Sequence, residues 1–220
     1  LSFCLPFPAE AEIHEDSITV KHLRDNLALT KEEQEWLSKH SNIKIGIDAG
    51  YPPYSFLDKN KKFIGVAPDF ISILAKGLGI NFEPVPDLSW PQILQNAKDK
   101  ELDVVATAVI TPERLEFLNF SQVYIPTPLV IMTRHDRENT ISSADDLAGK
   151  TVALVKGYSS SKRVLQEHPG ILQHLVDSPL EGLQAVAAGE AQAYVGVLGV
   201  NFYMAQQHGL SNLVIASRYD

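Results

Sequence analysis

Hydrophobic and polar positions divide the chain into short elements with two different periods. Residues 43–48 alternate between apolar and polar, which predicts a strand with one buried face. Residues 104–109 are almost entirely apolar, as is typical of a strand buried on both faces of a parallel sheet. Within residues 69–78, apolar residues recur every three or four positions instead, which predicts a helix. Its expected apolar face consists of Phe70, Ile71, Leu74 and Leu78.

Capping residues mark where other helices begin. Thr30 and Glu33 form a capping box, and Ser89 with Gln92 forms a second one. Strands and helices alternate along the whole chain, which indicates an α/β fold.

The order of elements repeats after about residue 130, with strands expected at 151–155 and 192–197. This repeat alone is weak evidence for two lobes, because any two helix-to-strand units look alike. Two segments, 124–134 and 213–217, support the interpretation, because each can cross between two sheets as a hinge strand. We therefore expect two lobes. The expected division is 1–29 as signal remnant and linker, 30–130 as lobe 1 with a returning strand at 213–220, and 131–212 as lobe 2.

The composition excludes several classes of protein. A net charge of −8 leaves no basic stripe for a nucleic-acid backbone, so no nucleic-acid partner is expected. Cys4 is the single cysteine and lies in residues 1–11, which are typical of the tail of a secretory signal. No later apolar run reaches the length of about 18 residues that a membrane span needs. Metal-binding spacings, nucleophile elbows and phosphate loops are absent from the sequence, so we expect no metal, cofactor or catalytic residue.

Arg114 is the strongest candidate for ligand binding. Thr111 can cap a short helix with Pro112 in its first position, which places Arg114 near the positive helix end. Its planar guanidinium can hold a carboxylate through two hydrogen bonds. The alternative is a surface arginine paired with Glu113 or Glu116. We favour ligand binding because Arg114 follows a predicted buried strand, and α/β sheets bind ligands at strand ends.

Two loops offer further binding groups. Tyr51 and Tyr54, with Phe56 beyond them, can supply aromatic faces that cover a ligand stem or stack on a cation. Residues 157–160 form a turn before a helix, where free amides and hydroxyls suit a carboxylate. An N-cap serine without any ligand is the alternative for this turn.

An ordered set of motifs resembles one known family. The set comprises residues 43–56, the helix with Asp69, the Ser89-Trp90 helix start, 111–121, and 146–150 with Gly157 beyond. It resembles family 3 of the extracellular solute-binding proteins, the polar amino-acid-binding type, over roughly residues 30–220. Residues 29–37 are more specifically similar to the start of Venus-flytrap sensor domains in BvgS-type histidine kinases and diguanylate cyclases. The resemblance implies a two-lobed, type II periplasmic-binding-protein fold with a hinge of two crossing strands.

The resemblance also implies roles for individual residues. Arg114 would grip an α-carboxylate and Thr107 would meet the ligand amino group, while Tyr51 and Trp90 would contact the ligand. Tyr158 and Ser159 would belong to the loop that completes the clamp from lobe 2.

Two positions depart from the pattern of the family. Val109 stands where relatives often have a hydroxyl, and it offers only its backbone. Val197 stands where many amino-acid binders carry an acid that neutralises the ligand ammonium. Because an unpaired buried ammonium is costly, another group must supply this charge, or the ligand is not a free α-amino acid.

The resemblance implies a periplasmic sensor domain that closes on a small carboxylate, such as an amino acid, and signals to a membrane-bound kinase or cyclase. A free amino-acid-binding protein of an ABC transporter is the alternative, and a dehydratase on the same fold is a more distant one. The dehydratase would need an acid or a base in the cleft. The resemblance also implies attachment to the inner membrane through a region after residue 220, together with the remainder of lobe 1, and it allows a dimer.

Overall fold

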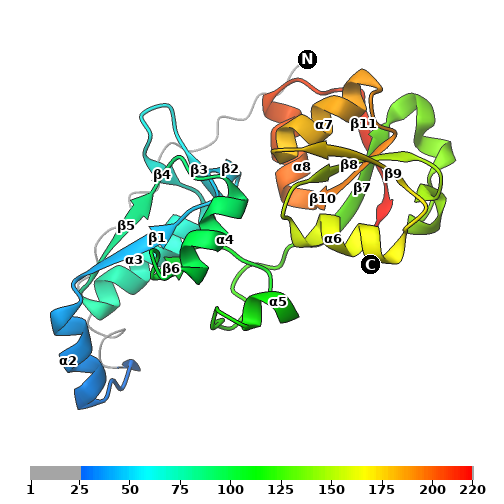
Figure 1. Cartoon of the computed structure of the whole chain (residues 1–220). Helices are drawn as coiled ribbons and strands as arrows, with labels where there is room; N and C mark the ends of the chain where they lie inside the picture. Colours follow the sequence, from blue (N-terminus) through cyan, green and yellow to red (C-terminus); the bar gives the residue numbers. More distant parts are fainter. Residues whose placement is uncertain (1–25, 220) are drawn as a thin grey trace.

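The structure is a computed structural model that describes residues 26–219. Two groups of elements, lobe 1 and lobe 2, lie side by side and are joined by an extended segment (Figure 1). Lobe 1 contains α2 (Lys31–Lys39), β1 (Asn42–Gly46), β2 (Gly50–Tyr51), β3 (Ser55–Leu57), β4 (Phe63–Ile64), α3 (Val66–Leu78), β5 (Asn81–Val85), α4 (Trp90–Lys98), β6 (Val104–Val105) and α5 (Pro112–Leu115). Lobe 2 contains β7 (Leu129–Arg134), the 3₁₀ helices η1 (His135–Thr140) and η2 (Ala144–Leu147), β8 (Thr151–Val155), α6 (Ser159–Glu167), β9 (Leu172–Val176), α7 (Pro179–Ala188), β10 (Ala193–Val197), α8 (Leu198–Gln207) and β11 (Leu213–Arg218).

Lobe 1 is built on a parallel sheet in the order β5-β1-β6. Strand β1 alternates as predicted, with Ile43 and Ile45 buried and Lys44 exposed. A second, antiparallel sheet of β2, β3 and β4 packs beside it, since Leu57 and Phe63 contact the same small core. Both predicted capping boxes are present at the starts of α2 and α4.

One prediction for lobe 1 was wrong and another was confirmed only in part. The strand expected at 104–109 is reduced to the two residues of β6, which among the described residues pairs with β1 alone. It is not buried on both faces, because Val104 is exposed. On α3, Ile71 packs on the core, but Phe70 and Leu74 are more than 40% exposed. This helix carries apolar residues on two faces, and the sheet of lobe 1 covers only one of them.

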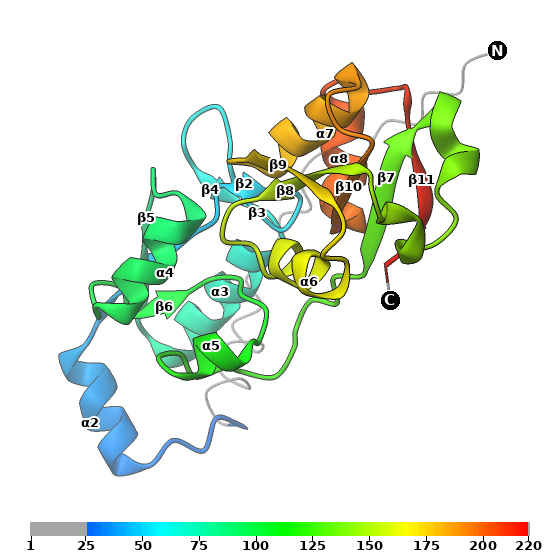
Figure 2. The same ribbon diagram turned by 45° about the vertical axis from the view of Figure 1, so that its right-hand side comes forward.

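Lobe 2 has a five-stranded sheet in the order β11-β7-β10-β8-β9. Alternate residues of β8 serve two separate cores: Ala153 and Val155 face the core of α7 and α8, while Val152 and Leu154 face the core that includes Val164 of α6. The sheet is therefore buried on both faces, which explains the nearly continuous apolar runs of its central strands. Figure 2 shows α6 and the pair α7 and α8 as separate layers.

The segments expected to form the hinge lie mostly in lobe 2. Residues 124–128 run without regular structure from lobe 1 into β7. Strand β11, expected to return to lobe 1, pairs antiparallel with β7 in the sheet of lobe 2. Within residues 26–219, none of the helices has the length and apolar character required to cross a bilayer.

Candidate ligand-binding cleft

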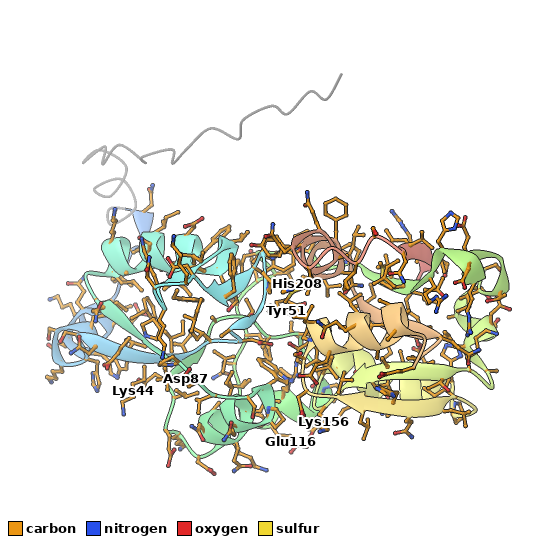
Figure 3. The ribbon with its side chains drawn as sticks, turned by 90° about the horizontal axis from the view of Figure 1, so that it is seen from above. Lys44, Tyr51, Asp87, Glu116, Lys156 and His208 are labelled. Carbon is orange, nitrogen blue, oxygen red and sulfur yellow. The ribbon has the colours of Figure 1, made fainter. Side chains whose placement is uncertain are left out.

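A cleft of about 1090 Å³ lies between the two lobes. Lobe 1 contributes the loops after β1 and β6 and the start of α4, and lobe 2 contributes the loop before α6 and the end of β10. Tyr51 is labelled where the lobes meet in Figure 3. All nine residues predicted from the sequence line this cleft: Tyr51, Tyr54, Trp90, Thr107, Val109, Arg114, Tyr158, Ser159 and Val197. Their contacts with a ligand stay a prediction.

Arg114 is a nearly buried cation at the edge of the cleft. Thr111 caps α5 as predicted, and its hydroxyl accepts a hydrogen bond from the Arg114 amide at 3.3 Å. The Arg114 side chain is 5% exposed, and its Nη1 donates to the Val109 carbonyl at 2.9 Å. Burial lowers the pKa of Arg114, but an arginine remains charged in proteins. No carboxylate in residues 26–219 lies within ion-pair distance of Arg114, so the guanidinium keeps donors for a bound anion.

Trp90 connects Arg114 to the opposite lobe. Its ring lies under the Arg114 guanidinium, whose carbon is 5.1 Å from the ring centroid. The indole Nε1 donates to the Gly157 carbonyl in lobe 2 at 3.1 Å. A Cβ added to Gly157 would meet Trp90 Cδ1 at 3.4 Å, and its φ of +75° also favours glycine. The predicted aromatic contact therefore also joins the two lobes.

Asp48 is a titratable residue of the cleft that the sequence did not point to. It lies in the cleft just after β1, where its Oδ2 accepts from the Tyr158 hydroxyl of lobe 2 at 2.5 Å and its Oδ1 accepts from the Gly50 amide at 3.1 Å. Burial raises the pKa of the Asp48 carboxyl, although both hydrogen bonds oppose that shift. The one available signal was an acid at the carboxyl end of a parallel strand, the edge at which such sheets bind ligands.

Two glycines make room for Tyr194 in the floor of the cleft. A Cβ at Gly182 would lie 2.8 Å from Tyr194 Cδ2, and one at Gly196 would lie 2.6 Å from Tyr194 Cε1. Burial raises the pKa of the Tyr194 phenol, and the charge of Asp48 adds to this shift. Val197, the last residue of the same strand, lines the cleft without offering a charge.

Other contacts join the lobes around the cleft. Glu113 of α5 forms an exposed ion pair with Lys162 of α6, and this contact lowers the pKa of Glu113. Glu113 is thus ion-paired with Lys162 and not with Arg114, although its charge still opposes the burial that lowers the pKa of Arg114. The N-cap of α6 is Tyr158, so the turn before α6 is not capped by a serine.

These positions suit a small molecule with two opposite charges. Arg114 offers cationic donors from lobe 1, and Asp48 offers a partly buried carboxylate beside Tyr158 of lobe 2. In the part of the chain that the structure describes, no three His, Cys, Asp or Glu side chains are grouped to hold a metal ion. The fold and the cleft define a two-lobed Venus-flytrap ligand-binding protein.

Comparison with known proteins identifies the family. Residues 43–207 match the bacterial extracellular solute-binding proteins, family 3, and the chain belongs to this family. Members of the family are typically non-enzymatic, and membership implies a location outside the cytoplasm.

Relatives include both sensors and transport proteins. The virulence sensor protein BvgS of Bordetella pertussis is 26% identical over 193 residues, which cover 88% of this chain and 16% of BvgS. The L-cystine-binding protein TcyJ of Escherichia coli is 28% identical over 177 residues, covering 80% of this chain and 64% of TcyJ. This chain therefore spans only a small part of the sensor relatives that it matches.

Solved structures confirm the predicted fold. The periplasmic VFT2 domain of Bordetella pertussis BvgS aligns with a TM-score of 0.78 and 26% identity, over 88% of this chain and 82% of that domain. The arginine-bound form of truncated ArgBP from T. maritima aligns with a TM-score of 0.73 and 25% identity, over 84% and 89% of the two chains.

Proposed function

We propose that this chain is the ligand-binding domain of a periplasmic sensor and that its lobes close on a small zwitterionic carboxylate, such as an amino acid. The single observation that carries the proposal is Arg114, a nearly buried cation in the cleft without a carboxylate partner among the described residues. Burying such a charge is costly unless an anion pairs with it. A ligand carboxylate held by the guanidinium fork would provide that anion.

Asp48 supplies the negative charge that Val197 lacks. A cationic group of the ligand placed beside Asp48 would offset the cost of desolvating this carboxylate, while the ligand carboxylate meets Arg114. The similarity to an arginine-bound protein and to an L-cystine-binding protein supports amino acids as the first compounds to test.

A thermal-shift screen of amino acids and small carboxylates tests the proposal. A ligand at one hundred times its dissociation constant adds about 2.7 kcal/mol to the free energy of unfolding. Arg114→Ala should abolish the shift that the best compound gives, whereas Arg218→Ala, which removes an exposed arginine of β11 outside the cleft, should retain it. A full shift with Arg114→Ala would refute the carboxylate site.

The sensor role rests on similarity to BvgS over most of a periplasmic domain. A free ABC-transporter binding protein is the alternative, supported by the similarity to TcyJ. We propose that the full protein is anchored in the inner membrane and continues into a kinase or cyclase. Fractionation of cells that express the whole gene distinguishes the two, because a sensor would be recovered with membranes and a transporter component with the periplasmic fraction.

Residues after 220 would complete lobe 1 under this proposal. Phe70, Ile73 and Leu74 on α3 are more than 40% exposed, a row of large apolar side chains that further chain could cover. A polypeptide extended past residue 220 should therefore unfold at a higher temperature than the 220-residue chain. An unchanged melting temperature would contradict the proposal that residues after 220 cover α3.

A dehydratase would use Asp48 as its acid or base, because burial raises the pKa of this carboxyl. We favour binding because both carboxylate oxygens of Asp48 already accept hydrogen bonds from Tyr158 and Gly50. Mass spectrometry of small hydroxy acids incubated with the chain would detect dehydration if the enzyme were correct.

A further inference from the structure

Three aromatic rings contact one another at one end of the cleft, and one of them is hydrogen-bonded to the Asp48 carboxylate. The Tyr158 ring meets the Tyr51 ring at 70° with centroids 6.2 Å apart, and it meets the Trp90 ring at 76° with centroids 6.0 Å apart. Rings that meet at such steep angles can serve as adjacent walls of an aromatic cage, and one face of the Trp90 ring already carries the Arg114 guanidinium. Asp48 lies beside these walls, since its carboxylate accepts the Tyr158 hydroxyl. We refer to Asp48, Tyr51, Trp90 and Tyr158 as the Asp48 box.

The Asp48 box has charge but few free hydrogen-bond acceptors. Each oxygen of Asp48 already accepts one hydrogen bond, from Tyr158 and from the Gly50 amide, which leaves about two of its four lone-pair sites for a ligand. The Trp90 indole is a donor bonded to lobe 2, and Thr107 is another side chain of the predicted site that can accept. Val197, on the facing strand β10, lines the cleft without a polar side chain. A primary ammonium brings three N–H donors and a guanidinium brings five, and each donor needs an acceptor once it leaves water.

We infer that the Asp48 box recognises an N-alkylated ammonium, so that the preferred ligand is a carboxylate carrying a methylated rather than a primary amine. This inference rests on the proposed function, which places the ligand carboxylate on Arg114. A trimethylammonium group has a full charge and no N–H donors, so the Asp48 charge and the ring faces satisfy it completely. Aromatic cages attract such cations through the negative faces of their rings. An acid at position 197 is then not needed, because a fully alkylated cation has no N–H group that requires another hydrogen-bond acceptor.

Isothermal titration calorimetry at neutral pH tests the inference with two matched series. The first series is glycine, N,N-dimethylglycine and N,N,N-trimethylglycine, and the second is 4-aminobutyrate with its dimethyl and trimethyl derivatives. In at least one series, affinity should rise by about tenfold from the primary amine to the trimethylated compound. Equal or tighter binding of the primary amine in both series, or no binding of either trimethylated compound, would overturn it.

Variants at Tyr158 separate recognition by the ring from recognition by the hydroxyl. Tyr158→Phe keeps the ring and should keep the preference for methylation, while Tyr158→Leu should reduce that preference to about twofold or less. Circular dichroism verifies that both variants are folded. An unchanged preference in a folded Tyr158→Leu variant would show that the Asp48 box is not the recognition element.

L-arginine keeps the two proposals distinguishable. If L-arginine binds and Arg114→Ala abolishes its binding, but neither trimethylated compound binds, the carboxylate site stands and the inference about alkylation fails. If no carboxylate shows binding that depends on Arg114, the proposed function itself fails.

Discussion

Gly199 offers a test of lobe closure by a single methyl group. It lies in α8 of lobe 2, and a Cβ added there would be 2.3 Å from the Tyr54 hydroxyl oxygen and 3.0 Å from Tyr54 Cζ, which belong to lobe 1. Because residue 199 is already helical, alanine introduces no backbone strain and removes a helix penalty of up to about 1 kcal/mol. The substitution Gly199→Ala therefore perturbs the contact between the lobes more than it perturbs either lobe.

The expected magnitude follows from overpacking. Inserting a methyl group into a packed contact costs about 1–3 kcal/mol, and the lower half of this range applies because the tip of Tyr54 can move. This cost of about 1–2 kcal/mol falls on the arrangement in which Tyr54 of lobe 1 meets α8, so ligand affinity should decrease by roughly 5- to 30-fold. The melting temperature without ligand should stay equal or rise slightly. Titration calorimetry with the best compound of the screen measures the first quantity, and circular dichroism measures the second.

A double-mutant cycle provides the control. Tyr54→Phe removes the oxygen that the new methyl group would meet, so Gly199→Ala should cost less affinity in that background than in the natural chain. If Gly199→Ala binds as tightly as the natural chain, the lobes do not hold ligand in the arrangement in which Tyr54 contacts α8, and the reasoning from closure is wrong.

Two further predictions concern the floor and the anionic end of the cleft. Gly196→Ala would place a Cβ 2.6 Å from Tyr194 Cε1 and 2.7 Å from Asn201 Oδ1. Urea unfolding should therefore show that the free energy of unfolding falls by about 1–3 kcal/mol. A decrease of less than about 0.5 kcal/mol would contradict the close packing of Tyr194 against Gly196. Asp48→Asn should raise the free energy of unfolding at neutral pH. The pKa of Asp48 is higher in the folded chain than in the unfolded chain, so the folded state binds this proton more tightly. The stability that this group contributes is therefore fully present below its ordinary pKa of 3.8 and is lost as pH rises through the raised pKa. The same variant should not differ in this way at pH values below 3.8, and affinity for a cationic ligand should fall as pH decreases through the raised pKa of the natural chain.

Local signals in the sequence predicted the parts of the site that local structure holds. Thr111 and Pro112 predict the short helix that carries Arg114, and the structure contains this helix at that position. The aromatic loop and the turn at 157–160 likewise face the cleft because each directly follows a strand that periodicity could identify.

Contacts between distant segments could not be predicted in this way. Asp48 and Tyr158 are 110 positions apart, and no sequence pattern around either residue predicts the hydrogen bond between them. The fit of Tyr194 between Gly182 and Gly196 depends on how α7 packs on β10. Periodicity also identified the apolar positions of α3 without deciding which of them would be covered, because coverage depends on the neighbours of the sheet.

The two charged ends of the cleft depend differently on the meeting of the lobes. The contacts of Arg114 with Val109, Thr111 and Trp90 all lie within lobe 1, so this cation is positioned whether or not lobe 2 approaches. Asp48 instead shares its carboxylate with Tyr158 of lobe 2, and its surroundings are complete only when the lobes meet. We therefore expect a carboxylate without a cationic group to bind lobe 1 through Arg114 yet to favour closure weakly, since it gains nothing from the Asp48 box. A ligand can shift closure only by the difference in its affinity for the two arrangements, so the cation, more than the carboxylate, should determine whether binding becomes a signal.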